Sequence, residues 1–284
     1  MTHVPRIKAP ANTCDVHMHV IYPEDKLPFS PENKGRFPPF TAENYMKVAK
    51  NLGIGRAVVV VTPAYGTDNR CVFQAMQDLA LPTRGVIALS ADAPDDMFRD
   101  AKAAGIVGLS TFMLGGRGVI DWPELSGLAV RASEFGMHID LQMNGHELPE
   151  RFDLLKNLPC DLVIDHIGKF LNPPTAVDDP AVRCLFDLLD TGNTYVKLSA
   201  AGETSNDRPP YMNDSGRIAQ ALARRFEDRL FWASNWPHLG DPDPARKPDN
   251  ADLLDCLLTW AADDKIQHKI LVTNPGRFYF GDPA

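Results

Sequence analysis

The stretch Arg-Ala-Val-Val-Val-Val-Thr at residues 56–62 determines the expected fold. A strand with one face in water alternates apolar and polar residues, whereas this run is apolar on both faces. Strands of that kind are typical of parallel sheets that are covered by helices. Gly53 and Gly55 come just before the run and end a predicted helix that begins after Thr41, a good N-cap residue. The stretch therefore predicts an α/β protein.

The same alternation of strand and helix continues through the chain. We predict strands at 14–20, 56–62, 85–90, 106–110, 138–143, 161–165, 194–198 and 229–234. Helices are expected at 41–51, 69–81, 94–104, 122–135, 149–158, 180–189, 216–226 and 251–262. Eight βα units in about 250 residues close into a (β/α)8 barrel. An open doubly wound sheet is the alternative, but no Gly-x-Gly-x-x-Gly follows the first strand. We expect one TIM-barrel domain over residues 1–284.

Composition narrows the class of partner. The formal net charge is −8 and like charges are not clustered, so a nucleic-acid surface is not expected. The first ten residues carry no secretory signal, and no apolar run of about 18 residues predicts a membrane span. The five cysteines are scattered without a Cys-x-x-Cys pair, which favours reduced thiols. These features predict a cytoplasmic protein with a small-molecule partner and carry no signal for oligomeric state.

In such a barrel the site lies at the carboxyl ends of the strands. Alternation along the first strand places Asp15, His17 and His19 on one face, with Val16, Met18 and Val20 on the other. The polar candidates at the other strand ends are Thr67, Asn69, Arg117, Gln142, Asn144, Asp165, His166, Lys197, Ser199, Asn235 and His238. The set is rich in imidazoles and amides and poor in free carboxylates.

Several candidates also have a plain structural interpretation. Two imidazoles on one inward face are costly to bury without partners, so His17 and His19 favour function. His238 could simply be a loop residue bonded to backbone, and Asp165 a partner that orients a histidine. Lys197 in the middle of a strand either meets a substrate anion or pairs with an internal carboxylate.

Motifs at three strand ends resemble the amidohydrolase superfamily. They are Asp-Val-His-Met-His at 15–19, Ile-Asp-His-Ile-Gly at 164–168 and Asn-Trp-Pro-His at 235–238. Pro-Phe-Ser-Pro at 28–31, Gly-Thr-Asp-Asn at 66–69, and Leu-Val-Thr-Asn-Pro at 271–275 with Arg277 and Tyr279 are similar to its lactonase branch. That branch includes enzymes that hydrolyse 2-pyrone-4,6-dicarboxylate and enzymes that isomerise galactarolactone. The resemblance spans about residues 12–280.

Asn235 stands where the resemblance implies a catalytic carboxylate. His17, His19 and His166 could hold a divalent metal such as zinc, but an amide is a poor fourth ligand. The lactonase branch also works without metal, so we expect no cofactor. An amide cannot take a proton from water, although it can orient a hydroxyl. Intramolecular attack by a substrate hydroxyl would reduce the demand for a base.

The resemblance therefore implies a metal-independent lactone isomerase of galactarate catabolism that converts a galactaro-1,5-lactone to the 1,4-lactone. In this hypothesis His17, His19 and His166 polarise the carbonyl and share proton transfers, with His238 nearby. Asn235 orients the hydroxyl, and Lys197 or Arg117 holds the free carboxylate. Thr67, Asn69 and Gln142 complete the predicted substrate contacts. Leu109 and Gln142 occupy positions where a pyrone lactonase is expected to carry arginine and tyrosine.

Three alternatives remain open at this point. The first is a hydrolytic lactonase in which Asn235 replaces an aspartate. The second is a metal-dependent decarboxylase of the same superfamily. The third, from a different class, is a non-catalytic sugar-acid binding protein, which ligand would stabilise without being converted.

Overall fold

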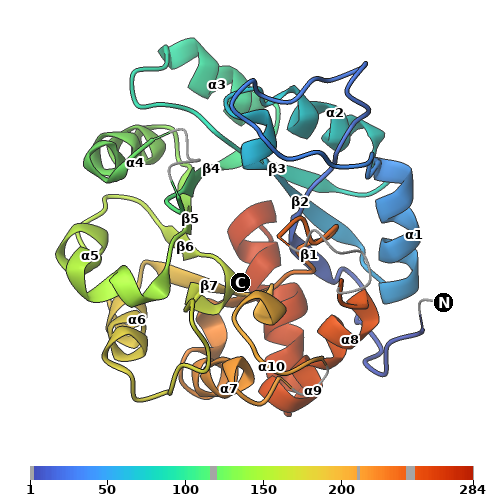
Figure 1. The fold of residues 1–284 in the computed structure, drawn as a ribbon, viewed down its shortest axis with the longest axis vertical. Coiled ribbons are helices and arrows are strands. Elements are labelled where there is room, and N and C mark those ends of the chain that lie inside the picture. Colours follow the sequence, from blue (N-terminus) through green and yellow to red (C-terminus); the bar gives the residue numbers. More distant parts are fainter. Residues whose placement is uncertain (1–2, 116–119, 210–211, 241–246, 284) are drawn as a thin grey trace.

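The structure is a computed structural model that describes residues 3–115, 120–209, 212–240 and 247–283. Its eight strands form one sheet in chain order, and each neighbouring pair is parallel. The helices surround the strands as an outer ring (Figure 1). The strands are β1 Cys14–Met18, β2 Arg56–Val60, β3 Thr83–Ile87, β4 Ile106–Phe112, β5 His138–Gln142, β6 Leu162–Ile164, β7 Thr194–Leu198 and β8 Leu230–Trp232. The expected (β/α)8 barrel is confirmed.

Backbone hydrogen bonds beyond the end of β8 bring the last strand to the first. Asn235 N donates to His17 O at 2.9 Å, and His19 N donates to Trp236 O at 2.9 Å. The residues that follow β8 therefore run beside β1 and its extension. This pairing leaves the barrel nearly closed and places Asn235 next to His17.

The apolar run of β2 is buried on both faces, as predicted. Val58 and Val60 pack in a cluster of strand residues inside the barrel. Val59 and Val61 belong instead to the larger core between the strands and the helices. All four side chains are at most 4% exposed. The two layers explain why no polar residue interrupts the run.

The first strand departs from the predicted alternation. Its pairing with β2 shifts register between Asp15 and Met18, which marks a bulge or irregularity. Val16 packs inside the barrel, while Asp15 accepts a hydrogen bond from Tyr45 of helix α1 at 2.9 Å. The prediction that Asp15 shares a face with His17 and His19 was therefore wrong, because the irregularity changes the facing of the strand part-way along.

The helices have the bounds α1 Ala42–Leu52, α2 Arg70–Asp78, α3 Asp95–Ala103, α4 Leu125–Glu134, α5 Leu148–Leu155, α6 Pro180–Asp190, α7 Ser215–Arg225, α8 Asn250–Asp255, α9 Leu257–Trp260 and α10 Asp264–His268. Thr41 caps α1 through a reciprocal capping box with Asn44, and Gly53 ends the helix at φ 76°. The expected helix at 251–262 occurs as α8 and α9. None of the described helices is long and apolar enough to cross a membrane.

The C-terminal segment closes the amino end of the barrel. After α10 the chain forms two π-helical turns, Lys269–Thr273 and Gly276–Phe280. Tyr279 is 2% exposed and packs with Phe231 of β8 at a ring distance of 5.2 Å. It also meets His138, the first residue of β5, at 5.5 Å. The opposite, carboxyl end of the barrel is left for the site.

Candidate functional site

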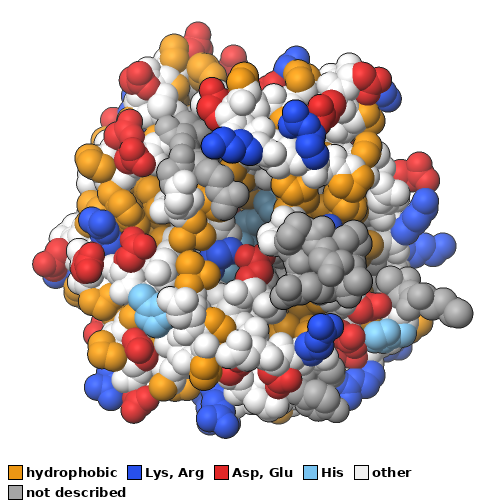
Figure 2. Space-filling model, in the orientation of Figure 1, with side chains coloured by type: hydrophobic (Ala, Val, Ile, Leu, Met, Phe, Trp, Pro, Cys, Tyr) orange, Lys and Arg blue, Asp and Glu red, His pale blue; other side chains and the backbone are white. Residues whose placement is uncertain are grey.

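Three histidines converge at the carboxyl ends of β1 and β6. His17 lies in β1, His19 lies just beyond it, and His166 is the second residue after the end of β6. Ring centroids are 4.8 Å apart for His17 and His19, and 5.0 Å apart for His17 and His166. All three are buried. The face shown in Figure 2 is hollowed near its centre, where histidine, acidic and basic side chains meet.

Hydrogen bonds to neighbouring groups indicate which nitrogen carries the proton in two of these rings. His19 Nδ1 lies 2.8 Å from Val60 O, and a carbonyl can only accept, so Nδ1 carries the proton. The other nitrogen, Nε2, then offers a free lone pair in the neutral ring. His17 Nδ1 lies 3.0 Å from the ammonium of Lys197, which can only donate. The proton of neutral His17 is therefore on Nε2, and the two rings present one acceptor and one donor.

Burial keeps the imidazoles neutral. It lowers the pKa of His19 to about 3, and the neighbouring His17 lowers that pKa further. Burial also lowers the pKa of His17, although Asp165 opposes the shift. The pKa of His166 lies well below its ordinary value for the same reason, and its Nδ1 is 2.8 Å from the hydroxyl of Ser199. At neutral pH the cluster consists of uncharged rings.

A buried ion network supports the histidines from inside the barrel. Lys197 is 0% exposed and donates to Asp140 Oδ2 at 2.5 Å. Its ammonium is also 3.1 Å from Asp165 Oδ1, which lies 3.3 Å from His17 Nδ1. The second interpretation of Lys197, pairing with internal carboxylates, is the one that the structure has. Its expected role in holding a substrate carboxylate does not fit this buried, fully paired position.

The two carboxylates of this network differ in their preferred state. Burial would raise the pKa of Asp165, but the charge of the Lys197 ammonium is the main opposing cause, and that pKa lies well below the ordinary value. Burial and the neighbouring Asp165 together raise the pKa of Asp140. Asp165 is thus the ionised partner that balances the Lys197 charge.

Left-handed backbone conformations turn the chain at the strand ends. His166 after β6, Ala200 after β7 and Asn235 after β8 have φ values of 58°, 46° and 57°. Such conformations are costly for residues other than glycine, and they cluster at functional sites. They direct the His166 and Asn235 side chains at the carboxyl end of the barrel.

Asn235 meets a carboxylate that the sequence did not reveal. Its Nδ2 donates to Glu203 Oε1 at 3.1 Å, and Lys169 forms an ion pair with Glu203 Oε2. Glu203 lies in the 3-10 turn Ala201–Glu203 after β7, and Lys169 follows the turn His166–Gly168 after β6. The candidates from the strand ends, which were poor in free carboxylates, therefore missed Glu203. Both residues lie five positions beyond their strands, so a longer window after each strand would have included them.

Some predicted residues lie apart from the histidine cluster. His238 bonds Asn250 Oδ1 of α8 through Nε2 at 3.0 Å, and no ring contact joins it to His17, His19 or His166 in the described residues. Burial lowers the pKa of His238 to about 4. His238 is thus a hydrogen-bonded loop residue, but its partner is the side chain of Asn250 rather than the backbone that the simpler interpretation named.

The loop after β2 has a structural role. Asn69 exchanges two hydrogen bonds with the backbone of Ala88, donating at 2.8 Å and accepting at 2.9 Å, so its amide is occupied. Thr67 is exposed, and its carbonyl accepts a further bond from Asn69 at 3.2 Å. Arg117 lies outside the described residues. None of these positions adds a described contact to the histidines.

Strands β4 and β5 contribute differently from expectation. Gln142 ends β5, is half-buried, and its side-chain amide has no hydrogen-bond partner among the described residues. Leu109 is 0% exposed and packs in the core between strands and helices, so it does not line the site. Because β4 extends to Phe112, the comparison of Leu109 with a substrate-gripping arginine was misplaced.

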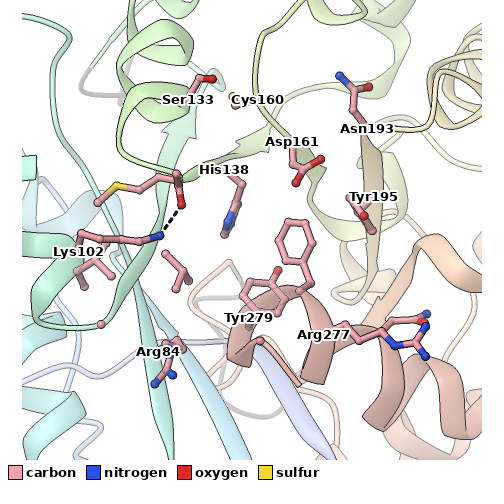
Figure 3. A pocket seen from close by; sticks show the side chains of 18 of the residues that line it. Arg84, Lys102, Ser133, His138, Cys160, Asp161, Asn193, Tyr195, Arg277 and Tyr279 are labelled. Carbon is pink, nitrogen blue, oxygen red and sulfur yellow. Dashed lines mark hydrogen bonds between the residues drawn. The ribbon is translucent and has the colours of Figure 1, made fainter. Parts of the chain in front are cut away.

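A second hollow lies at the other end of the barrel. It has a volume of about 1300 Å³ and is lined by residues near the amino ends of the strands, including Arg84, His138 and Tyr195. Figure 3 shows these side chains together with Lys102 and Tyr279 from neighbouring segments. None of the predicted site residues lines it. Since TIM-barrel chemistry occurs at the carboxyl ends of the strands, the histidine cluster is the candidate active site.

Comparison with known proteins agrees with this geometry. The model of the amidohydrolase family matches residues 14–281. The chain belongs to the amidohydrolase family. Among solved structures, the Agrobacterium tumefaciens protein ATU3138 superposes with a TM-score of 0.89 at 27% identity, covering 99% of this chain and 100% of that one.

Two characterised relatives have names that refer to lactones. The 4-sulfomuconolactone hydrolase of Rhizobium radiobacter is 30% identical over 277 residues, covering 95% of this chain and 90% of the relative. The D-galactarolactone isomerase of Agrobacterium fabrum is 28% identical over 278 residues, covering 97% and 93%. This amidohydrolase is therefore similar along almost its whole length to both a hydrolase and an isomerase.

The donor set for a metal is incomplete. Ligand atoms of His17, Asp165 and His166 lie within 4.8 Å of one another, the one such group among the described residues. Asp165 already faces the Lys197 ammonium, and Glu203 accepts from Asn235 and pairs with Lys169. At the end of β8 the amide of Asn235 offers no charge. The one carboxylate of this group is therefore shared with an ammonium, and the position after β8 adds no second anionic ligand.

Proposed function

We propose that this amidohydrolase is a lactone isomerase that converts a galactaro-1,5-lactone to the 1,4-lactone by intramolecular acyl migration. The observation that carries the proposal is the amide of Asn235 beside three buried, neutral imidazoles. Neutral rings can polarise a carbonyl and exchange protons, whereas the amide cannot serve as the base for a water molecule. The similarity to a galactarolactone isomerase supports the same reaction.

In the proposed reaction a hydroxyl of the substrate attacks its own lactone carbonyl. Nε2–H of His17 donates to the carbonyl oxygen as negative charge develops there. Asn235 orients the attacking hydroxyl through Oδ1, since its Nδ2 donates to Glu203. The lone pair on Nε2 of His19 and the ring of His166 can share hydrogen bonds with other hydroxyls of the substrate. Because attacking and leaving oxygens belong to one molecule, proximity supplies much of the rate enhancement.

Substrate contacts follow from the free groups around the cluster. The amide of Gln142 has no described partner and suits a hydroxyl of a polyhydroxylated substrate. Lys197 is buried in its own ion network. Arg117, which lies outside the described residues, therefore stays the partner that we propose, from the sequence alone, for the free carboxylate of the lactone. We further propose that the enzyme needs no metal and serves cytoplasmic galactarate breakdown. Dialysis against a chelator should leave turnover unchanged, and a loss restored by zinc would contradict metal independence.

Hydrolysis of a lactone is the second candidate, and a specific observation favours it. The Glu203 carboxylate lies 3.1 Å from the Asn235 amide, where it could activate a water instead of a substrate hydroxyl. The similarity to a sulfomuconolactone hydrolase is compatible with that reaction.

Turnover in ¹⁸O-labelled water separates the candidates. Purified enzyme is mixed with galactaro-, glucaro- and pyrone lactones, and products are identified by proton NMR and mass spectrometry, with enzyme-free samples as control. Isomerisation gives a new lactone without ¹⁸O, whereas hydrolysis places one ¹⁸O in an open-chain carboxylate. Predominant ¹⁸O incorporation would refute the isomerase proposal. Thermal stabilisation by a lactone that is never converted would indicate a binding protein.

A further inference from the structure

The carboxylate of Glu203 is held by two neighbouring side chains at the carboxyl end of the barrel. Asn235 donates to one of its oxygens at 3.1 Å, and Lys169 pairs with the other. The Glu203 side chain is 27% exposed, whereas that of Lys169 is only 10% exposed. The carboxylate is therefore held from two sides and remains accessible to a small molecule.

The backbone around this carboxylate is shaped to admit it. A β-carbon at Gly240 would lie 2.8 Å from Glu203 Oε1 and 2.9 Å from its Cδ, closer than carbon atoms normally approach. Lys169 and Asn235 both have left-handed backbone conformations, with φ values of 46° and 57°. Three loops, after β6, β7 and β8, thus converge on one carboxylate. Convergence of this kind is typical of a functional group that must be held in one place.

The proposed reaction needs a base at the position that Glu203 occupies. The attacking hydroxyl must lose a proton as the new ester bond forms, and Asn235 cannot take it. Among the described residues, Glu203 is the carboxylate to which that amide donates, and its oxygens have further lone pairs. A second carboxylate at 235 would repel Glu203 at 3.1 Å, whereas an amide donates to it. The amide at 235 and the glutamate at 203 therefore complement one another.

We propose that Glu203 is the general base of the reaction and that Lys169 positions it. This inference rests on the proposed lactone conversion. Glu203 takes the proton of the substrate hydroxyl while the oxygen of that hydroxyl forms a bond to the lactone carbonyl carbon. The tetrahedral species then breaks its bond to the original ring oxygen, and protonated Glu203 returns the proton to that oxygen. Isomerisation consumes no proton, so the carboxylate is restored after each turnover.

Three variants test the role. Glu203→Gln keeps the size of the side chain and an acceptor for Asn235 but removes the base. Lys169→Met also removes the ion pair between Lys169 and Glu203, but it leaves the Glu203 carboxylate in place. Glu227→Gln is the matched control, since Glu227 pairs with Lys269 at 2.5 Å before β8, away from the site. For each variant, kcat, KM and the pH profile are measured, together with circular dichroism and calorimetric binding of galactarate.

Glu203→Gln should lower kcat by about 10²- to 10⁴-fold with little change in galactarate binding. Lys169→Met should lower kcat by at most about tenfold, because the base remains. Glu227→Gln should match the wild type. A Glu203→Gln enzyme within about threefold of wild-type kcat would overturn the inference. So would an equal loss in Lys169→Met, since the ion pair alone would then explain both.

Gly240→Ala provides a variant that leaves Glu203 in the chain. The added β-carbon must displace the carboxylate, so kcat should fall between the values for Lys169→Met and Glu203→Gln. An unchanged rate in Gly240→Ala would count against a precisely placed base.

Labelled water keeps the two proposals separate. If the wild type hydrolyses lactones and incorporates ¹⁸O, isomerisation is refuted, and the same Glu203→Gln loss then assigns Glu203 as the base that activates water. If the wild type isomerises and Glu203→Gln retains its rate, only the role of Glu203 is refuted. A wild type that converts no lactone overturns both.

Discussion

The ammonium of Lys197 donates a 3.0 Å hydrogen bond to Nδ1 of His17, although the two residues are 180 positions apart in the sequence. This contact places the proton of neutral His17 on Nε2, on the side of the ring opposite Lys197. The same ammonium balances Asp140 and Asp165 inside the barrel. The Lys197 ammonium therefore has two roles. It balances the buried aspartates, and it orients His17 so that Nε2–H can donate to the substrate.

Lys197→Met should destabilise the protein strongly. It leaves Asp140 and Asp165 buried without their cation, so the free energy of unfolding should fall by about 3–5 kcal/mol. Urea denaturation followed by circular dichroism measures this value. Lys156→Met is the control, because Lys156 pairs with Asp153 on the exposed surface and should contribute about 0–1 kcal/mol. Equal losses in the two variants would contradict the importance of the internal network.

Asn235→Asp should weaken isomerisation and strengthen metal binding. The new carboxylate would face Glu203 at hydrogen-bond distance, and the repulsion should lower isomerase kcat by about tenfold or more. It would also supply an anionic ligand beside the histidines, so calorimetry should show tighter zinc binding than in the wild type. Asn157→Asp, at an exposed position, serves as the control. Unchanged zinc affinity in Asn235→Asp would contradict the conclusion that the wild type lacks an anionic metal ligand at position 235.

Stability should fall as the solution is acidified from pH 7 to pH 5. Burial lowers the pKa of five histidines, with values of about 3 for His19 and His138 and about 4 for His238, while His17 and His166 are also lowered. Below about pH 6.5 the unfolded chain therefore binds protons that the folded chain does not. Each such site reduces the free energy of unfolding by up to about 1.4 kcal/mol per pH unit.

Two buried aspartates oppose this trend. Burial raises the pKa of Asp15 and of Asp140, so the folded chain takes up their protons first and gains stability on acidification. The five histidines should outweigh them, and the urea midpoint should shift downward. His238→Asn should reduce the slope by about one proton. A midpoint that is independent of pH over this range would refute the assignment of neutral buried rings.

Tyr45→Phe should cost about 1.5–3 kcal/mol of stability with little effect on lactone turnover. Its hydroxyl donates to Asp15 at 2.9 Å, where Ser234 also donates through its backbone N at 2.9 Å. The carboxylate links α1, β1 and the end of β8, away from the histidine rings. Denaturant melts and steady-state rates measure the two effects. A variant of wild-type stability would show that the Tyr45 contact contributes nothing net.

Much of the architecture was predictable because it depends on local patterns. The apolar run of β2, the capping residue Thr41 and the glycine at 53 each act over a few neighbouring residues, and all three were confirmed. The face of Asp15 was not predictable, since an irregularity in pairing depends on the neighbouring strand rather than on the residue itself. The C-terminal turns that close the barrel also depend on packing against distant strands.

The sequence by itself determined that this is an eight-stranded barrel with His17, His19, His166 and Asn235 at one end, because strand direction fixes which residues share that end. Only the tertiary structure decided what those residues meet. Glu203 contacts Asn235, and Lys197 contacts His17, although the residues of each pair come from loops or strands that are far apart in the chain. Pairing of charges across a barrel depends on distance in space, which spacing along the sequence does not encode.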